Sequence, residues 1–246
     1  MRIGIFSDVH GNLEALEEVL RAYEGRCVDK YVCLGDIVGY GSQPNECCEL
    51  VREYASLSIM GNHDAAVVGI MDYSYYYEAA RRALDWCREH LTSENLEWLA
   101  TLPFQQKDPS LPEVGYSHGS PLEPEVFDYV FAVEQARELL SNSNCLRKVN
   151  FIGHSHLCKS FVLRGGHAFD VVGPMFSVQP DCSYIVTVGS VGQPRDLDSR
   201  ACAGIYDTGK GTFEYLRVEY DVEAAARKIL EANLSMDFAK RLFLGV

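Results

Sequence analysis

Two histidines separated by one serine end a buried-looking segment of the chain, in the stretch NFIGHSH at 150–156. In extended backbone, residues i and i+2 point to the same side, so His154 and His156 could present both imidazoles to one point. Two loop histidines that hydrogen-bond to backbone would explain an isolated pair equally well. The choice between a metal site and ordinary loop residues therefore depends on the rest of the chain.

Four other strand-like segments end in the same kind of side chain. These residues are Asp8 and His10 in SDVHGN, Asp36 in GDIVGYG, Asn62, His63 and Asp64 in GNHD, and His118 in SHGS. In open α/β sheets, sites form where the carboxyl ends of the strands converge. Five consecutive strand ends that each deliver Asp, Asn or His are hard to explain by core filling.

These side chains predict a metal centre. Carboxylate and amide oxygens and imidazole nitrogens suit divalent Mn, Fe, Zn, Co or Ni, with manganese our first expectation. The candidate ligands are Asp8, His10, Asp36, Asn62, His118, His154 and His156. These ligands are too many for one tetrahedral site. They are enough for two ions if one carboxylate bridges the ions and water fills the remaining positions. Two ions about 3.5–4 Å apart form a clamp for phosphoryl displacement and can activate a water between them.

The elements that must position these residues alternate along the first half. Apolar runs and helical spacing predict strands over 2–8, 30–36, 57–62, 113–119 and 148–154, and helices over 12–23, 44–55, 73–101 and 132–140. Asn12 is an expected N-cap, and Pro44 suits a first helical turn. Such alternation indicates βαβ units and a largely parallel sheet. We expect an α/β fold of two packed mixed β-sheets flanked by helices, in a single domain over 1–246.

After residue 160 the pattern changes to strands joined by Gly-rich and Asp-rich turns. DTGKG at 207–211 is a hairpin candidate, and helices near 221–233 and 236–243 close the chain. The apolar C-terminal piece FAKRLFLGV could cap the core or meet a second subunit, so the oligomeric state stays open.

Composition narrows the class of protein. The 246 residues are 47% hydrophobic and 23% charged, which is ordinary for a globular protein. We expect a cytoplasmic protein with reduced thiols, because no secretory signal is evident and the nine cysteines form no C-x-x-C motif. The net charge of −13 argues against duplex nucleic acid or an anionic membrane as main partner. Two divalent ions would nevertheless make the site itself attractive to a small anionic substrate.

In this order, DVHGN, GDIVGYG, GNHD, SHG and GHSH resemble the motifs of calcineurin-like metallophosphoesterases. The resemblance spans roughly 1–200. It is closest to a prokaryotic branch with VGYG after the second motif and GSVGQPRD (189–196) late in the chain. That branch includes phosphodiesterases, phosphatases and dinucleoside tetraphosphate hydrolases. The resemblance implies an α/β/β/α sandwich. It also implies one ion on Asp8, His10, Asp36 and His156, and a second on Asp36, Asn62, His118 and His154, with Asp36 bridging.

The resemblance also implies roles in catalysis. His63 would act on the leaving-group oxygen as general acid or charge stabiliser, with Asp64 orienting it and Asn62 beside the substrate. Arg195 could pair with a phosphate oxygen, but a surface salt bridge to Asp196 or Asp198 is an equal alternative. The tyrosines 73 and 75–77 could stack a nucleobase or simply pack a helix, and their role stays open.

We therefore expect a dinuclear metal-dependent hydrolase of a small phosphorylated substrate, with nucleotides among the candidates. The bond cleaved would be a phosphomonoester, a phosphodiester or a nucleotide phosphoanhydride, by in-line attack of a metal-bridging hydroxide. One alternative is a metal-binding regulatory or scaffold protein with little turnover. Another is a dinuclear hydrolase of a carbon ester or amide.

Overall fold

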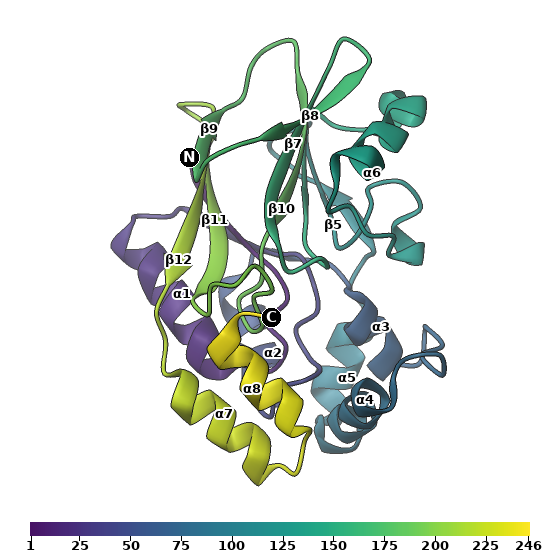
Figure 1. The fold of residues 1–246 in the computed structure, drawn as a ribbon, viewed down its shortest axis with the longest axis vertical. Helices are drawn as coiled ribbons and strands as arrows, with labels where there is room; N and C mark the ends of the chain where they lie inside the picture. The colour runs from purple at the N-terminus through teal and green to yellow at the C-terminus, as the bar shows by residue number, and fades with distance from the viewer.

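Two six-stranded mixed β-sheets pack against each other in the computed structural model, which describes residues 1–246 (Figure 1). The first sheet has the order β3 (Leu57–Ser58), β2 (Lys30–Cys33), β1 (Arg2–Phe6), β11 (Ala201–Asp207), β12 (Thr212–Val218), β9 (Met175–Ser177). The second has the order β4 (Gln105–Lys107), β5 (Val114–Ser117), β6 (Val149–Ile152), β10 (Ser183–Val188), β7 (Cys158–Arg164), β8 (His167–Val171). Strands β1 to β3 are parallel to one another, as are β5, β6 and β10.

Helices lie beside the two sheets and at the lower end of the molecule in the view of Figure 1. They are α1 (Leu13–Gly25), α2 (Pro44–Tyr54), α3 (Asn62–Val67), α4 (Glu78–His90), α5 (Ser93–Ala100), α6 (Val133–Glu138), α7 (Val222–Glu231) and α8 (Met236–Leu244). Two 3₁₀ segments span Pro124–Val126 and Leu139–Cys145. Helices α1 and α2 share a buried cluster with the first sheet, and α6 shares one with the second. None of the helices has the length and apolarity needed to cross a membrane.

The core lies in layers because side chains alternate along each strand. In β1, Ile3 and Ile5 belong to the cluster between the two sheets, whereas Phe6 belongs to the cluster under α1. Tyr23 of α1 ties its helix to this face, since its hydroxyl donates to the carbonyls of Ile5 at 2.9 Å and Gly204 at 3.1 Å. The expected fold class of two packed mixed sheets flanked by helices is confirmed.

Several local predictions are also confirmed. Asn12 caps α1, because its Oδ1 accepts from the backbone N–H of Ala15 at 3.2 Å. Pro44 is the first residue of α2. Strands β11 and β12 pair as an antiparallel hairpin across 207–211.

Two expected elements differ from the structure. The helix expected over 73–101 is two helices, α4 and α5, which begin at Glu78 and Ser93. The chain becomes extended at Leu91, and Thr92 starts α5 by accepting from Asn95 N–H at 3.2 Å. The strand expected over 57–62 ends at Ser58, because the GNHD motif opens α3 instead.

Candidate metal centre

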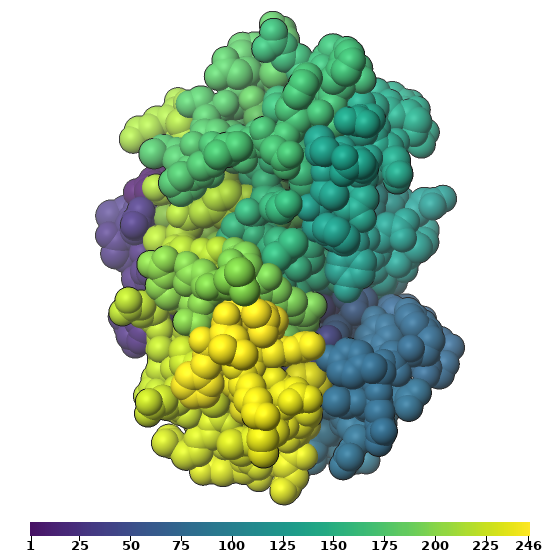
Figure 2. Space-filling model, in the orientation of Figure 1, coloured from purple at the N-terminus to yellow at the C-terminus, as the bar shows by residue number.

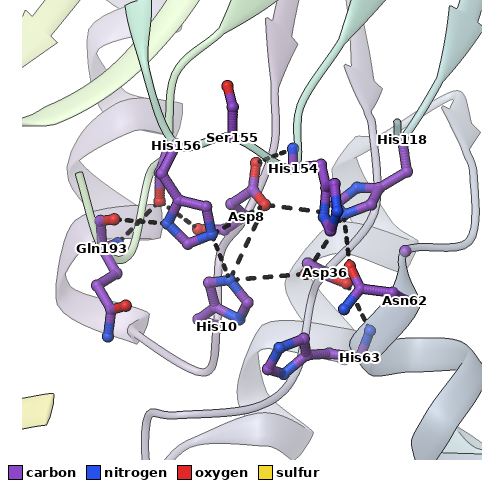
Figure 3. A network of polar contacts seen from close by, with 12 residues as sticks. Asp8, His10, Asp36, Asn62, His63, His118, His154, Ser155, His156 and Gln193 are labelled. Atoms are coloured by element: carbon purple, nitrogen blue, oxygen red, sulfur yellow. Dashed lines mark hydrogen bonds and ion pairs between the residues drawn. The ribbon is translucent and has the colours of Figure 1, made fainter. Parts of the chain in front are cut away.

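Five strand and helix ends deliver the expected ligands to one place (Figure 3). The first sheet supplies residues that follow β1 and β2, and the second supplies residues that follow β5 and β6. All of these side chains are at most 7% exposed; they are Asp8, His10, Asp36, Asn62, His118, His154 and His156. The structure therefore brings together every residue that the sequence nominates as a ligand.

The backbone reaches this arrangement by sharp turns rather than by extended strands. Five of these residues have positive φ, namely Asp8 (55°), His10 (49°), Asp36 (52°), His154 (63°) and His156 (58°). Such values are rare outside glycine and cost free energy that the surrounding packing must offset. The expectation that His154 and His156 share one side of an extended segment is therefore wrong. Their rings enter two separate groups.

The first group consists of Asp8, His10 and His156. The Nε2 atoms of His10 and His156 lie 3.1 Å apart, and Asp8 Oδ1 lies 3.3 Å from His156 Nε2. Each ring directs its Nδ1 to a carbonyl, at 3.0 Å from Val38 O and 2.6 Å from Gln193 O. A carbonyl only accepts, so each Nδ1 carries the proton and each Nε2 has a free lone pair. Asp8 Oδ1 is buried without a partner, so the group contains acceptors and no donor.

The second group consists of Asp36, His118 and His154, with Asn62 beside them. His118 Nε2 lies 3.1 Å from Asn62 Oδ1 and 3.3 Å from Asp36 Oδ2, while its Nδ1 lies 2.7 Å from the carbonyl of Leu34. The Asn62 amide nitrogen donates to the Tyr76 hydroxyl at 2.7 Å, which turns the amide oxygen toward the group. The rings of His118 and His154 are 5.0 Å apart between centroids.

Asp36 lies between the two groups. Its Oδ2 is 3.3 Å from His118 Nε2 and 3.7 Å from His10 Nε2, and its Oδ1 accepts from the backbone N–H of His63 at 2.8 Å. Only glycine fits at position 61, because a Cβ there would collide with Asp36 Oδ1. Two sets of converging lone pairs that share a carboxylate fit two cations, and histidine ligands in proteins typically donate Nδ1–H to carbonyls in this way.

His63 and Asp64 do not form the expected pair. The Asp64 carboxylate accepts from the backbone N–H groups of Ile37, Val38 and Gly61 at 3.0, 3.3 and 3.0 Å, and it does not contact the His63 ring. Asp64 therefore holds the loop after β2 against the start of α3. It sets the position of Asp36 and His63 through the backbone.

The His63 ring is packed by its neighbours instead. It lies 4.8 Å from the His10 ring and 4.5 Å from the Tyr40 ring, between centroids. Its Nδ1 is buried without a partner against Gly39, where a Cβ would collide with it. Nε2 is thus the ring nitrogen that a ligand can reach. A ring nitrogen of His63 also lies within 4.8 Å of ligand atoms of His10 and Asp36, so this residue adjoins the centre directly.

A cleft of about 520 Å³ opens beside the centre and is lined in part by Arg195. Arg195 donates to Gln193 Oε1 at 2.9 Å, and its guanidinium carbon lies 5.7 Å from the Tyr40 ring centroid. The alternative of a salt bridge to Asp196 or Asp198 is not realised. Asp196 pairs with Arg217, and Asp198 pairs with Arg200 and Arg217.

Tyrosines of the 73–77 segment divide between packing and the cleft. Tyr73 donates to Asp85 Oδ1 at 2.6 Å and lies outside the cleft, whereas Tyr75, Tyr76 and Tyr77 line it.

Sequence reasoning missed three further residues of the site. Gln193 orients His156 through its carbonyl, Tyr129 stacks on the His154 ring at 3.8 Å, and Arg241 lines the cleft. The GSVGQPRD motif pointed toward Gln193, but nothing local in the sequence singles out Tyr129 or Arg241.

Comparison with known proteins matches this geometry to a family. A family model described as "Calcineurin-like phosphoesterase" matches residues 1–158, which carry all the candidate ligands. This chain belongs to the calcineurin-like phosphoesterase family. Members of the family typically bind two divalent metal ions, and the two ligand groups described above are the candidate sites here.

Two similar proteins match this chain over almost its whole length. The uncharacterized protein MJ0912 of Methanocaldococcus jannaschii is 37% identical over 245 residues, covering 99% of this chain and 98% of that protein. The crystal structure of a metallophosphoesterase from Sphaerobacter thermophilus is 36% identical with a TM-score of 0.84, covering 100% of this chain and 99% of that chain. The hypothetical protein PH1004 from Pyrococcus horikoshii OT3 shares the fold, with a TM-score of 0.80 at 19% identity and coverage of 100% and 98%.

Two effects shift the pKa values of the side chains in this phosphoesterase centre. Burial disfavours the charged form of each group, and neighbouring charged groups can oppose this effect. Burial alone would lower the pKa of His118, but Asp36 and Asp8 outweigh it and raise the pKa to about 9. Burial raises the pKa of Asp8 to about 7 and lowers that of His63 to about 4. Burial also opposes ionisation of Asp36, yet the charges of His118 and His63 hold its pKa well below the usual range. Without metal, a proton on His118 thus supplies the positive charge that Asp36 requires.

This proton gives the metal-free protein a specific pH dependence. Folding raises the His118 pKa from 6.5 to about 9, so its contribution to stability is complete below pH 6.5 and is lost as the pH rises through 9. Between about pH 7 and 9, the free energy of unfolding of chelator-treated protein should fall by about 1–2 kcal/mol from this source. Urea unfolding at a series of pH values measures the decline.

Two controls isolate the contribution of His118. A bound divalent ion replaces the proton, so metal-loaded protein should show a smaller decline over the same range. Metal-free His118→Asn should also lack the part of the decline that comes from His118. The ionisation of thiols affects the metal-free wild type, the metal-loaded wild type and the metal-free variant alike. Parallel pH curves for the three samples would contradict the assignment of this charge to His118.

Proposed function

We propose that this protein is a dinuclear metal-dependent hydrolase of phosphoesters. The observation that carries the proposal is the position of Asp36 Oδ2, between two groups of side-chain atoms of the kinds that bind metal ions. Family membership supports a phosphoester as the substrate rather than a carbon ester.

The proposed ligands divide between two ions that share Asp36. Asp8, His10 and His156 would hold one ion, and Asn62, His118 and His154 would hold the other. Manganese is our first choice, with Fe, Zn, Co and Ni also suited to this mixture of oxygen and nitrogen ligands. Bound ions supply a nucleophile at neutral pH and positive charge for the phosphoryl oxygens.

Residues around the ions would bind the substrate and assist the leaving group. Asn62, His63 and Arg195 all line the cleft, so a phosphate at the ions would lie within their reach. Arg195 carries a buried, unpartnered Nε that could meet a phosphate oxygen. At neutral pH the His63 ring is uncharged, because its pKa is lowered to about 4 by burial. A neutral ring can still donate one hydrogen bond from Nε2 and stabilise charge on the departing oxygen.

Metal dependence and substrate class can be tested together. Chelator-treated protein should not hydrolyse bis-p-nitrophenyl phosphate, and added Mn²⁺ should restore turnover. His10→Ala should lower turnover by at least about 100-fold, as expected when a metal is poorly held. His167→Ala is a matched control, because His167 is exposed on β8 and outside the cleft.

Two results would overturn the proposal. Protein that binds metal by elemental analysis but shows no turnover with any of the five metals would be a scaffold. Comparable turnover of p-nitrophenyl acetate and the phosphodiester would indicate a carbon-ester hydrolase.

The role of His63 can be separated from metal binding. His63→Ala should keep its metal content but lose roughly 10²–10⁴-fold in turnover, the usual scale for a positioned acid–base group. The loss should shrink as the leaving group of an aryl phosphodiester becomes more acidic, since a good leaving group needs little stabilisation. Turnover across a series graded by leaving-group pKa measures this trend, with His90→Ala as control. A deficit of constant size would show that His63 does not act on the leaving group.

A further inference from the structure

The cleft beside the proposed metal centre is lined by residues of the site and by aromatic side chains. Asn62, His63 and His154 belong to the first set. The aromatic set includes Tyr40, Tyr75, Tyr76, Tyr77 and Tyr129. A volume of about 520 Å³ lies within the range of sites that hold one small organic ligand. A bare phosphate would leave most of this space unfilled.

Three of these tyrosines are about half exposed or more. Tyr75 is 70% exposed, Tyr77 is 50% exposed and Tyr129 is 46% exposed, and Tyr129 comes from a different segment of the chain than the other two. Tyr129 stacks on His154 at 3.8 Å, and Tyr75 packs edge-on against Tyr76 at 5.0 Å and 78°. Tyr76 in turn accepts the hydrogen bond from Asn62. The aromatic surface therefore continues outward from two proposed metal ligands.

Two arginines give the same cleft a positive charge. Arg195 and Arg241 both line it, and neither forms a salt bridge, whereas Asp128 is the one carboxylate among the lining residues. Arg241 comes from α8, close to the C-terminus, and its guanidinium makes no hydrogen bond within the chain. Figure 2 shows α8 in yellow beside the blue segment that carries α3 to α5, with green residues above α8 and teal residues above the blue segment. Unpaired arginines in a chain of net charge −13 indicate a site for an anion.

We infer that this cleft is a nucleotide-binding site in which Tyr75 stacks the base and Arg241 contacts the phosphate. The inference rests on the proposed function for the place of the phosphate, which would lie at the metal ions. A sugar phosphate would satisfy the arginines but leave the tyrosine rings in water. A long polynucleotide would meet the repulsion of an acidic protein, so a ligand with one base or two fits better.

Equilibrium binding separates the contribution of the base from that of the phosphate. The probes are the 5′-phosphonate analogues of AMP and of ribose 5-phosphate, whose carbon–phosphorus bond resists hydrolysis. They differ only in the base. Calorimetric titration of the Mn²⁺-loaded protein should give at least roughly 10-fold tighter binding of the AMP analogue, as expected for one stacked base.

Variants assign this difference to named residues. Tyr75→Ala should remove most of the difference in affinity between the two analogues without changing the affinity for the ribose analogue. Tyr75→Phe should retain the wild-type difference. Arg241→Gln should weaken both analogues by a similar factor, roughly 10-fold. Phe169→Ala and Arg227→Gln are matched controls, since both residues are exposed and lie outside the cleft. Both control variants should bind like the wild type.

Three results would overturn the inference. They are equal affinity of the wild type for the two analogues, a Tyr75→Ala protein with the wild-type ratio, and affinity that rises steeply with the length of a single-stranded oligonucleotide. Failure of the proposed function gives a different pattern. In that case the AMP analogue would still bind more tightly than the ribose analogue, but no phosphoester would be hydrolysed with any metal.

Discussion

Three hydrogen bonds from imidazole Nδ1 to backbone carbonyls determine the chemistry of this centre. His10, His118 and His156 donate to the carbonyls of Val38, Leu34 and Gln193, of which the first two lie in the loop after β2 and the third in the loop after β10. Each bond turns Nε2 toward the centre, where it offers a lone pair when the ring is neutral; in the metal-free protein the Nε2 of His118 carries a proton instead. Two carboxylates and an amide oxygen face the same space. Their negative charges and dipoles repel one another unless a positive charge lies between them. A proton on His118 supplies one such charge, and metal ions would supply more.

The two-sheet architecture brings these lone pairs together. Neither sheet has a complete set of ligands, because Asp8, His10 and Asp36 follow strands of the first sheet and His118, His154 and His156 follow strands of the second. The apolar cluster between the sheets therefore sets the spacing of the centre as well as the stability of the fold. Five ligands adopt positive φ, and such strained turns persist only where packing on both sides holds them.

Much of this could be predicted from the sequence, because ligand type and strand ends are local properties. The two-sheet fold, the cap at Asn12 and the seven clustered residues all followed from short patterns. The left-handed turns did not, since no local pattern distinguishes them from extended backbone. The bonds of Asp64 to backbone amides were missed because they depend on the approach of α3 to the loop after β2. Tyr129 and Arg241 were missed for a similar reason, as packing between distant segments brings them to the cleft.

The central claim is that one carboxylate, Asp36, is shared by two metal ions. Anomalous diffraction from crystals of the manganese-loaded protein tests it most directly. The account predicts two anomalous peaks about 3.5–4 Å apart, both within bonding distance of Asp36. Asp8, His10 and His156 should surround one peak, and Asn62, His118 and His154 the other. A single peak, or two peaks of which only one contacts Asp36, would contradict the claim.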